Sequence, residues 1–280
     1  MSIKRLLGVF AHPDDEGLIG GALLQYGASG VETGLVYATR GEVGEISDPT
    51  LATPENLGQV REQEMHAAAE LLGVCNLWFL GYRDSGMMGT PQNEDAHALA
   101  RASVADVVGK LVKIIRQFRP QVMVTFDETG AYGHPDHIAI YQYTTGAFHA
   151  AADSALYPEL GPAHAISKLY YSSFSRSAMQ TMTEWLGAQE DYGRLFKEID
   201  PTTMGLSDEQ IDVRLNVEEW QETKARSWNM HRTQMNSNTL MARIPEELQR
   251  KWRSIECYQL ATSRVGPDVV GENDLFARVV

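Results

Sequence analysis

The chain has 280 residues, a net charge of −13, 43% hydrophobic residues and 22% charged residues. This is the composition of a globular protein with enough apolar material for a substantial core, which excludes a disordered chain. Nucleic acid and anionic membrane surfaces are not expected as partners, because both require clusters of Lys and Arg rather than an acidic balance.

Two further features concern the compartment in which the protein works. Cys75 and Cys257 are the only cysteines, and their separation suits neither a disulfide framework nor a zinc motif. The apolar run at 6–11 ends at His12 and is shorter than the roughly 7–15 residues of a secretory signal. No apolar stretch is long enough for a transmembrane helix. We therefore expect a cytoplasmic protein, while the sequence leaves its oligomeric state open.

Segments typical of strands and of helices alternate over the first 155 residues. The expected strands are 6–11, 31–39, 74–80 and 122–126. The expected helices are a short segment around 22–24, then 55–72, 96–118 and 135 to about 152. This alternation predicts an α/β fold, a Rossmann-like three-layer sandwich with a mostly parallel sheet, for which we expect the strand order 3-2-1-4-5.

The pattern is looser after residue 155. Strands are expected at 168–174 and 211–217, a helix at 217–231, and loops at 155–167 and 200–208. No long linker or low-complexity tract divides the chain. We therefore expect a single domain over 1–280, in which 1–155 form the parallel core and 156–280 complete the sheet and the substrate pocket.

A short pattern occurs twice, each time after a predicted strand. Residues 12–15 read His-Pro-Asp-Asp, and residues 134–137 read His-Pro-Asp-His. Proline suits the first turn of a helix, so each tetrapeptide places polar side chains at a strand-to-helix junction. Ligands of open α/β sheets bind beyond the carboxyl ends of the strands, where the strand order reverses. In the expected order, strands one and four meet at that point, so the two tetrapeptides are predicted to face each other.

Such a cluster of side chains suits metal chemistry. Two histidines and one carboxylate are a common ligand set for catalytic zinc, with one position left open for water. A further carboxylate and a further histidine would supply a base and an acid. A 2-His-1-carboxylate iron site is the alternative metal centre. Either tetrapeptide alone is more often a helix start with favourable acidic residues, but its repetition after two strands favours a metal site.

Residues 11–16 and 133–137 together resemble the signatures of the LmbE/PIG-L deacetylase family. Its members are zinc-dependent hydrolases that remove the acyl group from the nitrogen of an N-acetylglucosaminyl unit. Segments that also resemble the family are 39–42, 61–64, 81–87 and 230–234. Segments 83–87 and 131–134 look closest to the branch with the N-acetylglucosaminyl-inositol deacetylase and the mycothiol-conjugate amidase.

The resemblance implies a metal and its ligands. The metal is Zn²⁺, with Fe²⁺ or another divalent ion as alternatives, and the ligands correspond to His12, Asp15 and His137. Asp14 corresponds to the general base that takes a proton from the attacking water.

Three further catalytic roles follow from the resemblance. His134 corresponds to a positively charged partner of the oxyanion, or to the acid that protonates the leaving amine. Asp136 corresponds to the carboxylate that orients and charges His134, and Tyr132 to a mobile donor to the oxyanion.

Substrate contacts are also implied. Glu42, Arg61 and Asp84 match positions that line the sugar and polyol pocket in the thiol branch. Met87 is expected beside this pocket, and His231 is expected to approach it from the late helix. The alternatives are a surface ion pair for Arg61, loop capping for Glu42 and Asp84, and simple packing for His231.

The predicted function is removal of an N-acetyl group from a small glucosamine-containing molecule. An amidase that cleaves a larger thiol S-conjugate at the same nitrogen is one alternative. A metal-dependent sugar-binding protein without turnover is another, but such a protein would be expected to have lost Asp14 or His134. A nucleotide-binding dehydrogenase is disfavoured, because residues 12–16 replace the glycine fingerprint after the first strand.

Overall fold

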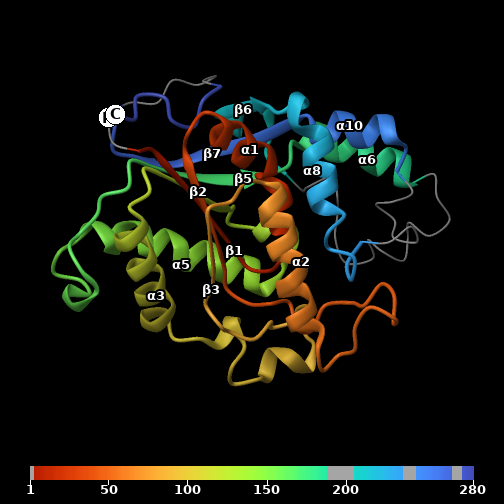
Figure 1. Cartoon of the computed structure of the whole chain (residues 1–280), viewed down its shortest axis with the longest axis horizontal. Helices are drawn as coiled ribbons and strands as arrows, with labels where there is room; N and C mark the ends of the chain where they lie inside the picture. The colour runs from red at the N-terminus through yellow and green to blue at the C-terminus, as the bar shows by residue number, and fades with distance from the viewer. Residues whose placement is uncertain (1–2, 188–204, 236–243, 267–272) are drawn as a thin grey trace.

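A mixed sheet forms the centre of the computed structural model, which describes residues 3–187, 205–235, 244–266 and 273–280 (Figure 1). Within these residues the sheet has seven strands in the order β3-β2-β1-β4-β5-β7-β6. The strands are β1 (Arg5–Phe10), β2 (Glu32–Tyr37), β3 (Asn76–Phe79), β4 (Val122–Phe126), β5 (Lys168–Ser173), β6 (Val213–Asn216) and β7 (Ile255–Ser263). The first five pair in parallel, which confirms the predicted order 3-2-1-4-5.

Helices cover the parallel strands on both faces. They are α1 (Gly20–Ala28), α2 (Leu57–Leu71), α3 (Val104–Phe118), α4 (Gly130–Gly133) and α5 (Pro135–Ala152). α3 packs against α5, whereas α1 and α2 each pack against the later helix α8 (Gln221–Trp228) (Figure 1). The chain runs from β1 to β2 and β3 on one side and then returns to pair β4 with the other side of β1, so the strand order reverses between β1 and β4.

The predicted helix at 96–118 begins only at Val104. Its apolar stripe is buried from Val107 to Phe118, but Val104 is 64% exposed. The preceding residues instead form the 3-10 helix Leu99–Arg101, because the backbone of Ala98 pairs with Arg83 across the adjoining loop. Local helical periodicity was therefore overruled by a tertiary backbone contact.

The region after residue 155 differs more from expectation. β5 and β6 match the predicted strands, but β7 was not predicted, and it pairs antiparallel with both. Its burial lacks a strict alternation, so no period-two signal marks it. Helices α6 (Arg176–Gly187) and α10 (Glu246–Arg253) were also not predicted. The predicted helix at 217–231 is shorter, with a 3-10 turn at Glu218–Trp220 followed by α8. Of the predicted loop at 200–208, residues 200–204 lie outside the described residues.

Short 3-10 helices connect the larger elements. They are Asp15–Leu18, Pro91–Glu94, Leu99–Arg101, Pro158–Leu160, Asp208–Gln210 and Glu218–Trp220. In the described part of the chain, every helix is too short or too polar to cross a lipid bilayer.

A buried carboxylate joins the two parts of the chain. Glu256, on β7, accepts hydrogen bonds from the backbone N–H groups of Gly21 (2.7 Å) and Ala22 (2.9 Å) at the start of α1. Lys224 of α8 and the hydroxyl of Tyr258 donate to the same carboxylate. A helix N-terminus has unpaired N–H groups and attracts negative charge. We propose on this basis that the whole chain folds as one cooperative domain.

Replacing Glu256 with Ala tests the one-domain proposal. The variant leaves the ammonium of Lys224 buried without its partner, so we expect a loss of about 3–5 kcal/mol in the free energy of unfolding. Urea denaturation followed by circular dichroism measures the change. Glu246→Ala is the control, because this exposed carboxylate pairs with Arg253 at the surface and should matter little. A second transition that the substitution leaves unmoved would contradict a single cooperative unit.

Candidate active site

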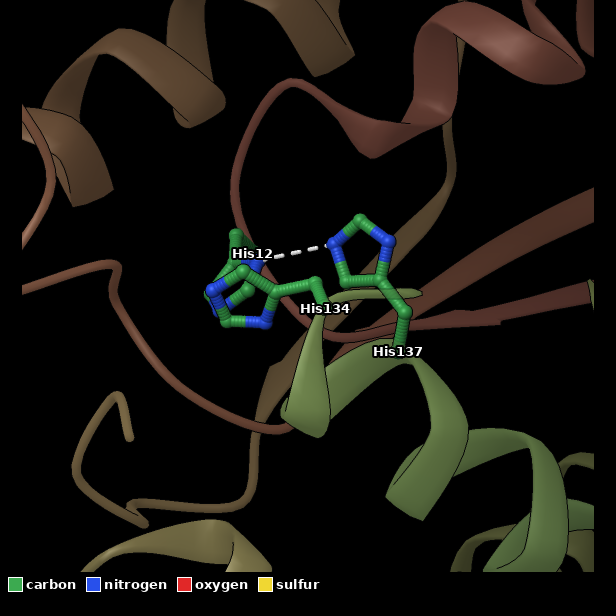
Figure 2. A group of neighbouring side chains, drawn as sticks. All are labelled: His12, His134 and His137. Atoms are coloured by element: carbon green, nitrogen blue, oxygen red, sulfur yellow. Dashed lines mark hydrogen bonds between the residues drawn. The ribbon is translucent and has the colours of Figure 1, made fainter. Parts of the chain in front are cut away.

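The two tetrapeptides meet at the carboxyl ends of β1 and β4, as the expected topology requires. His12 lies in the loop after β1, whereas His134 and His137 lie at the start of α5, and the three rings converge (Figure 2). His12 Nδ1 is 3.2 Å from His137 Nε2, although 125 residues separate them. All three side chains are buried.

Hydrogen bonds fix which nitrogens can bind a cation. His12 Nε2 is 3.2 Å from a carboxylate oxygen of Asp136, and His137 Nδ1 is 3.1 Å from the carbonyl oxygen of Gly130. Each of these ring nitrogens donates its proton to the oxygen, so in the neutral imidazoles the lone pairs are on His12 Nδ1 and His137 Nε2. Two lone pairs that face each other at 3.2 Å repel, so the two nitrogens can share either a proton, as a hydrogen bond, or a metal ion. The pair therefore fits a metal ion.

Asp15 completes a ligand set with these two nitrogens. Its carboxylate oxygens are 3.4 Å from His137 Nε2 and 3.8 Å from His12 Nδ1. Ligand atoms around tetrahedral zinc, with bonds of about 2.0–2.1 Å, are separated by roughly 3.3 Å. The backbone N–H groups of Ala11 and His12 donate to Asp15 Oδ2, the oxygen that faces His12, and hold the carboxylate in place. The donor atoms of the three residues that the resemblance implied as ligands thus lie 3.2–3.8 Å apart, with Asp15 Oδ1 facing His137 and Asp15 Oδ2 facing His12, and their role as ligands stays a prediction.

Two other donor groupings overlap with this one. In the first, ring nitrogens of His12, His134 and His137 lie within 4.8 Å of one another. In the second, a ring nitrogen of His12 and one carboxylate oxygen each of Asp84 and Asp136 lie within the same distance. The first grouping is weaker, because the Nδ1 lone pair of His134 already accepts the N–H of Asp136 at 3.1 Å. The second uses His12 Nε2, the atom that donates to Asp136.

The charges of the cluster also favour a cation. Burial raises the pKa of the Asp15 carboxyl to about 7 and lowers the pKa of His137. Burial also lowers the pKa of His12, but nearby carboxylates, above all Asp84, outweigh it and raise that pKa well above its usual value. Buried carboxylates therefore recruit a proton to His12. A divalent ion competes for the same place, because metal binding displaces protons from its ligands.

Asp136 supports His12 rather than His134. Its side chain is fully buried and contacts His12 Nε2, while the backbone N–H (2.9 Å) and the hydroxyl of Ser85 donate to its two oxygens. In the described part of the chain, Asp136 contacts His134 through its backbone, whose N–H donates to His134 Nδ1, and not through its carboxylate. This arrangement differs from the orienting role that the sequence implied for Asp136. A carboxylate behind a ligand histidine orients its ring and raises its basicity.

Ser85 is a residue that sequence reasoning missed. It follows Asp84 in the loop after β3 and lies in the family-like segment 81–87, but nothing in that segment indicates that its hydroxyl supports Asp136. Ser85→Ala removes one of the two bonds that hold Asp136, so we expect metal affinity to fall by about ten- to a hundredfold. Competition with a chromogenic chelator measures the affinity. Ser154→Ala, at an exposed loop position, is the matched control and should leave it unchanged. Equal affinity in the two variants would remove Ser85 from the support of the site.

His134 caps the first turn of α5, and this determines which of its ring nitrogens carries the proton. The backbone N–H of Asp136 occupies Nδ1, so the ring proton is on Nε2. Burial, reinforced by the charge of His12, lowers the pKa of His134 to about 4. His134 is therefore placed as a neutral hydrogen-bond donor at Nε2, and the two roles that the resemblance implied, partner of the oxyanion or acid for the leaving amine, stay predictions.

Asp14 has an unusual backbone conformation. Its φ is 101°, in the left-handed region that a residue with a side chain rarely adopts, and its N–H donates to Glu16 Oε2 at 3.0 Å. Burial raises the pKa of its carboxyl, although Arg61 at 3.2 Å opposes the rise. Strain of this kind is often found where a side chain must be aimed. A carboxylate with a raised pKa beside the ligands suits a general base.

Of the expected sugar-binding residues, Arg61 and Asp84 lie in the interior, whereas Glu42 is half-buried. Arg61 is 3% exposed and donates to the carbonyl oxygens of Gly41 and Pro13 as well as to Asp14. Gly41 needs to be glycine, since its φ is +66° and a Cβ there would lie 2.0 Å from the Arg61 guanidinium. Arg61 thus braces the loop that carries Asp14.

Asp84 and Glu42 form part of the same interior network. Asp84 is also 3% exposed, and its carboxylate is 3.6 Å from His12 Nε2. Burial raises the pKa of Asp84, but the attraction and hydrogen bond of His12 outweigh it and lower that pKa overall. Glu42 accepts from the backbone N–H of Asp84 at 3.2 Å. Contact of these residues with a substrate stays a prediction.

His231 lies beneath the site rather than in it. It is fully buried, and its Nε2 is 2.6 Å from Glu16 Oε1. Burial opposes charge on both groups, but their mutual attraction outweighs it, raising the pKa of His231 and lowering that of Glu16. Glu16 in turn accepts from Tyr37 and from the backbone of Asp14. The described geometry makes His231 a support for the Asp14 loop, and Glu16, which ends the first motif, is the link that sequence reasoning missed.

Tyr132 and Met87 are both partly exposed. Tyr132 is 38% exposed, its ring centroid is 5.0 Å from that of His137, and the backbone of the preceding Ala131 has a φ of 65°. Tyr132 lines a cavity of about 680 Å³ together with Asp14, Asp15 and His137. Met87 is 41% exposed and is not among the described residues that line this cavity.

Comparison with known proteins identifies the family. The family model described as GlcNAc-PI de-N-acetylase matches residues 7–148, a range that contains both tetrapeptides. The chain belongs to this family. A relative from Geodermatophilus obscurus, named 1D-myo-inositol 2-acetamido-2-deoxy-alpha-D-glucopyranoside deacetylase, is 36% identical over 98% of this chain and 97% of its own length. The resemblance to the PIG-L deacetylases is thereby confirmed.

Solved structures share the fold of this PIG-L family protein. The N,N'-diacetylchitobiose deacetylase of Pyrococcus horikoshii has a TM-score of 0.62 at 19% identity, with 92% of this chain and 83% of that one covered. The 4-carboxy-2-hydroxymuconate hydratase of Pseudomonas putida has a TM-score of 0.58, also at 19% identity, with coverage of 95% and 100%. Since one fold carries both a deacetylase and a hydratase, the reaction must be argued from the site.

Proposed function

We propose that this protein is a metal-dependent N-deacetylase that acts on a small glucosamine-containing molecule. One observation carries the proposal: two ring nitrogens with inward lone pairs and the Asp15 carboxylate converge beside Asp14, a carboxylate outside the ligand set. Ligands alone would bind a metal, but hydrolysis also needs a group that can accept a proton.

The residues divide into those that bind a metal and those that move protons. We assign His12, Asp15 and His137 as ligands of Zn²⁺, with Fe²⁺ or another divalent ion as alternatives. When bound, such an ion polarises an amide carbonyl and makes water a usable nucleophile at neutral pH. Asp14 accepts the proton of the attacking water. Glu16, through the Asp14 backbone, and Arg61, through the Asp14 carboxylate, fix the orientation of this side chain.

His134 and Tyr132 act on the charge that develops on the substrate. The Nε2–H of neutral His134 donates a hydrogen bond to the carbonyl oxygen as it becomes negative, or to the nitrogen that leaves as an amine. Burial and the nearby carboxylates raise the pKa of Tyr132, so its hydroxyl keeps its proton and can donate as well. Both donors lie beside His137, at ring-centroid distances of 5.0 Å.

The substrate class comes from the relatives. The Geodermatophilus protein is named as a deacetylase of an inositol 2-acetamido-2-deoxy-glucopyranoside, and we propose the N-acetyl group of such a glucosaminyl unit for this chain. Cleavage of a larger thiol conjugate at the same nitrogen is the alternative. Both cysteines are free thiols, which supports the proposal of a reducing compartment such as the cytoplasm.

A panel of N-acetylglucosaminides tests the function. The panel contains the free sugar, the inositol glycoside, a malate glycoside, chitobiose and a thiol conjugate, each assayed for release of a free amine with and without a chelator. Release from one member that the chelator abolishes would establish the reaction and its substrate class. A sugar-binding protein would instead bind a member without releasing an amine. No release with metal demonstrably bound would refute the proposal.

A further inference from the structure

The cavity beside the metal ligands continues beyond them into the second half of the chain. Its volume of about 680 Å³ equals that of roughly twenty water molecules. An acetyl group has three non-hydrogen atoms and fills only a small part of it. The cavity is therefore much larger than the reaction on an acetamide requires.

A row of aromatic side chains forms one wall. The ring centroids of Phe174 and Trp252 are 5.3 Å apart, and those of Trp252 and Trp228 are 6.3 Å apart. Trp228 packs directly on Gly17, where a Cβ would lie 3.3 Å from its ring. Gly17 comes two residues after Asp15, so the aromatic row begins at the ligand loop and leads away from it.

The other walls are also largely apolar. Ala178 of α6, Leu248 of α10 and Ile244 line the cavity. Two arginines on the lining are already paired, Arg214 with Asp208 and Arg253 with Glu246. Hydroxyl groups and an ammonium group also line the cavity, on Ser173, Ser175, Ser177, Thr181, Ser254 and Lys251, but most of its surface is apolar. Sugar hydroxyls placed against the apolar part would lose their hydrogen bonds to water without replacement. A hydrocarbon or aromatic group gains from the same transfer.

The roles proposed above decide which end of the amide faces the cavity. Asp14, Asp15, His137 and Tyr132 line it, whereas His134 is not among the described lining residues. If His134 donates to the leaving nitrogen, the glucosamine attached to that nitrogen lies on the His134 side. The group on the carbonyl carbon then points away from His134 and into the cavity.

We infer that the cavity is an acyl-binding subsite, and that the enzyme prefers glucosamine derivatives whose N-acyl group is a longer alkyl or aryl chain over N-acetyl derivatives. This inference rests on the proposed hydrolysis of an N-acyl glucosamine, and it names a longer acyl group, in place of acetyl, as the one that the enzyme prefers. The aromatic row contacts the alkyl or aryl part of the acyl group, while the residues of the ligand loop bind the amide.

The experiment compares matched substrates with the metal-loaded enzyme. N-acetyl, N-butanoyl, N-hexanoyl and N-phenylacetyl derivatives of one glucosaminide are assayed for kcat/KM. Each buried methylene is worth about fourfold, so we expect the hexanoyl substrate to exceed the acetyl substrate by at least about tenfold. A second series keeps the acetyl group and lengthens the glycoside from methyl to hexyl, and should show no such gain.

A substitution that fills the cavity links the preference to this place. Ala178→Phe is expected to lower kcat/KM for the hexanoyl substrate by about tenfold or more and to change that for the acetyl substrate by less than about threefold. Gln180→Phe is the matched control, because Gln180 lies on the same helix, is exposed and does not line the cavity. It should change neither value.

A binding readout that needs no turnover accompanies the kinetics. Hexanoate should perturb the fluorescence of Trp228 and Trp252 in the wild-type protein, and Ala178→Phe should abolish the change while Gln180→Phe preserves it. Thermal denaturation shows whether either variant is folded.

The outcomes separate this inference from the function on which it rests. A preference for long acyl groups that Ala178→Phe removes supports it. Release from the acetyl substrate with no gain for longer acyl groups overturns the acyl subsite and leaves the deacetylase function in place. A gain confined to the hexyl glycoside overturns it in favour of the other end of the substrate. No amine release from any substrate refutes the function and the inference together.

Discussion

Asp14→Asn is expected to reduce kcat by about a hundredfold to ten-thousandfold while the protein keeps its full metal content. The substitution preserves the size of the side chain and its reach toward Arg61, but an amide cannot accept the proton of the attacking water. The ligand atoms of His12, Asp15 and His137 are left in place. Steady-state kinetics, together with metal analysis of the purified protein, measures both quantities.

Asp106→Asn is the matched control for Asp14. Asp106 is an exposed carboxylate in the first turn of α3, so the same chemical change there should leave kcat and metal content unaltered. Full activity in the Asp14 variant would remove it as the base. Loss of metal in that variant would make Asp14 a ligand rather than a proton acceptor.

The second large effect is expected at His137. In His137→Ala the inward lone pair at Nε2 is lost, so metal affinity should fall by more than about a hundredfold and activity with it. The rest of the fold should persist, because burial, reinforced by His12 and His134, lowers the pKa of this imidazole, so its charged form has no part in stability. Equilibrium dialysis against buffered Zn²⁺ measures the affinity, and circular dichroism checks the fold.

His149→Ala provides the comparison on the same helix. His149 lies near the C-terminal end of α5 and is exposed, so its removal should change neither metal affinity nor activity. Unchanged metal binding in the His137 variant would point to another donor grouping, in which His12, Asp84 and Asp136 hold the ion.

Much of the site could be predicted because its motifs are local. Each tetrapeptide joins a buried strand to a helix start, and the parallel order brings β1 next to β4. Two short segments and one topological rule therefore predict that these side chains meet, while the choice of His12, Asp15 and His137 as the ligands came from the resemblance to the family. The approach of their donor atoms to within 3.2–3.8 Å is consistent with that prediction.

Roles that depend on hydrogen-bond partners could not be predicted. Asp136 is two residues from His134, yet its carboxylate contacts His12, because Ser85 and the fold of α5 turn it that way. His231 lies in a family-like segment, yet it is fully buried against Glu16. Proximity in the sequence predicts which residues lie near one another, but it does not predict which donor forms a hydrogen bond with which acceptor.

The sequence by itself determined the parallel core and the place of the two histidine motifs, since alternating strands and helices and a strand-order reversal are encoded in local periodicity. Only the tertiary structure decided the C-terminal part, including β7, the aromatic row from Trp228 to Phe174 and the carboxylate of Glu256 at the start of α1. These features depend on contacts between residues up to 235 positions apart. Such contacts leave no periodic signal in the segments that make them, because their free energy comes from burial and pairing in the assembled fold.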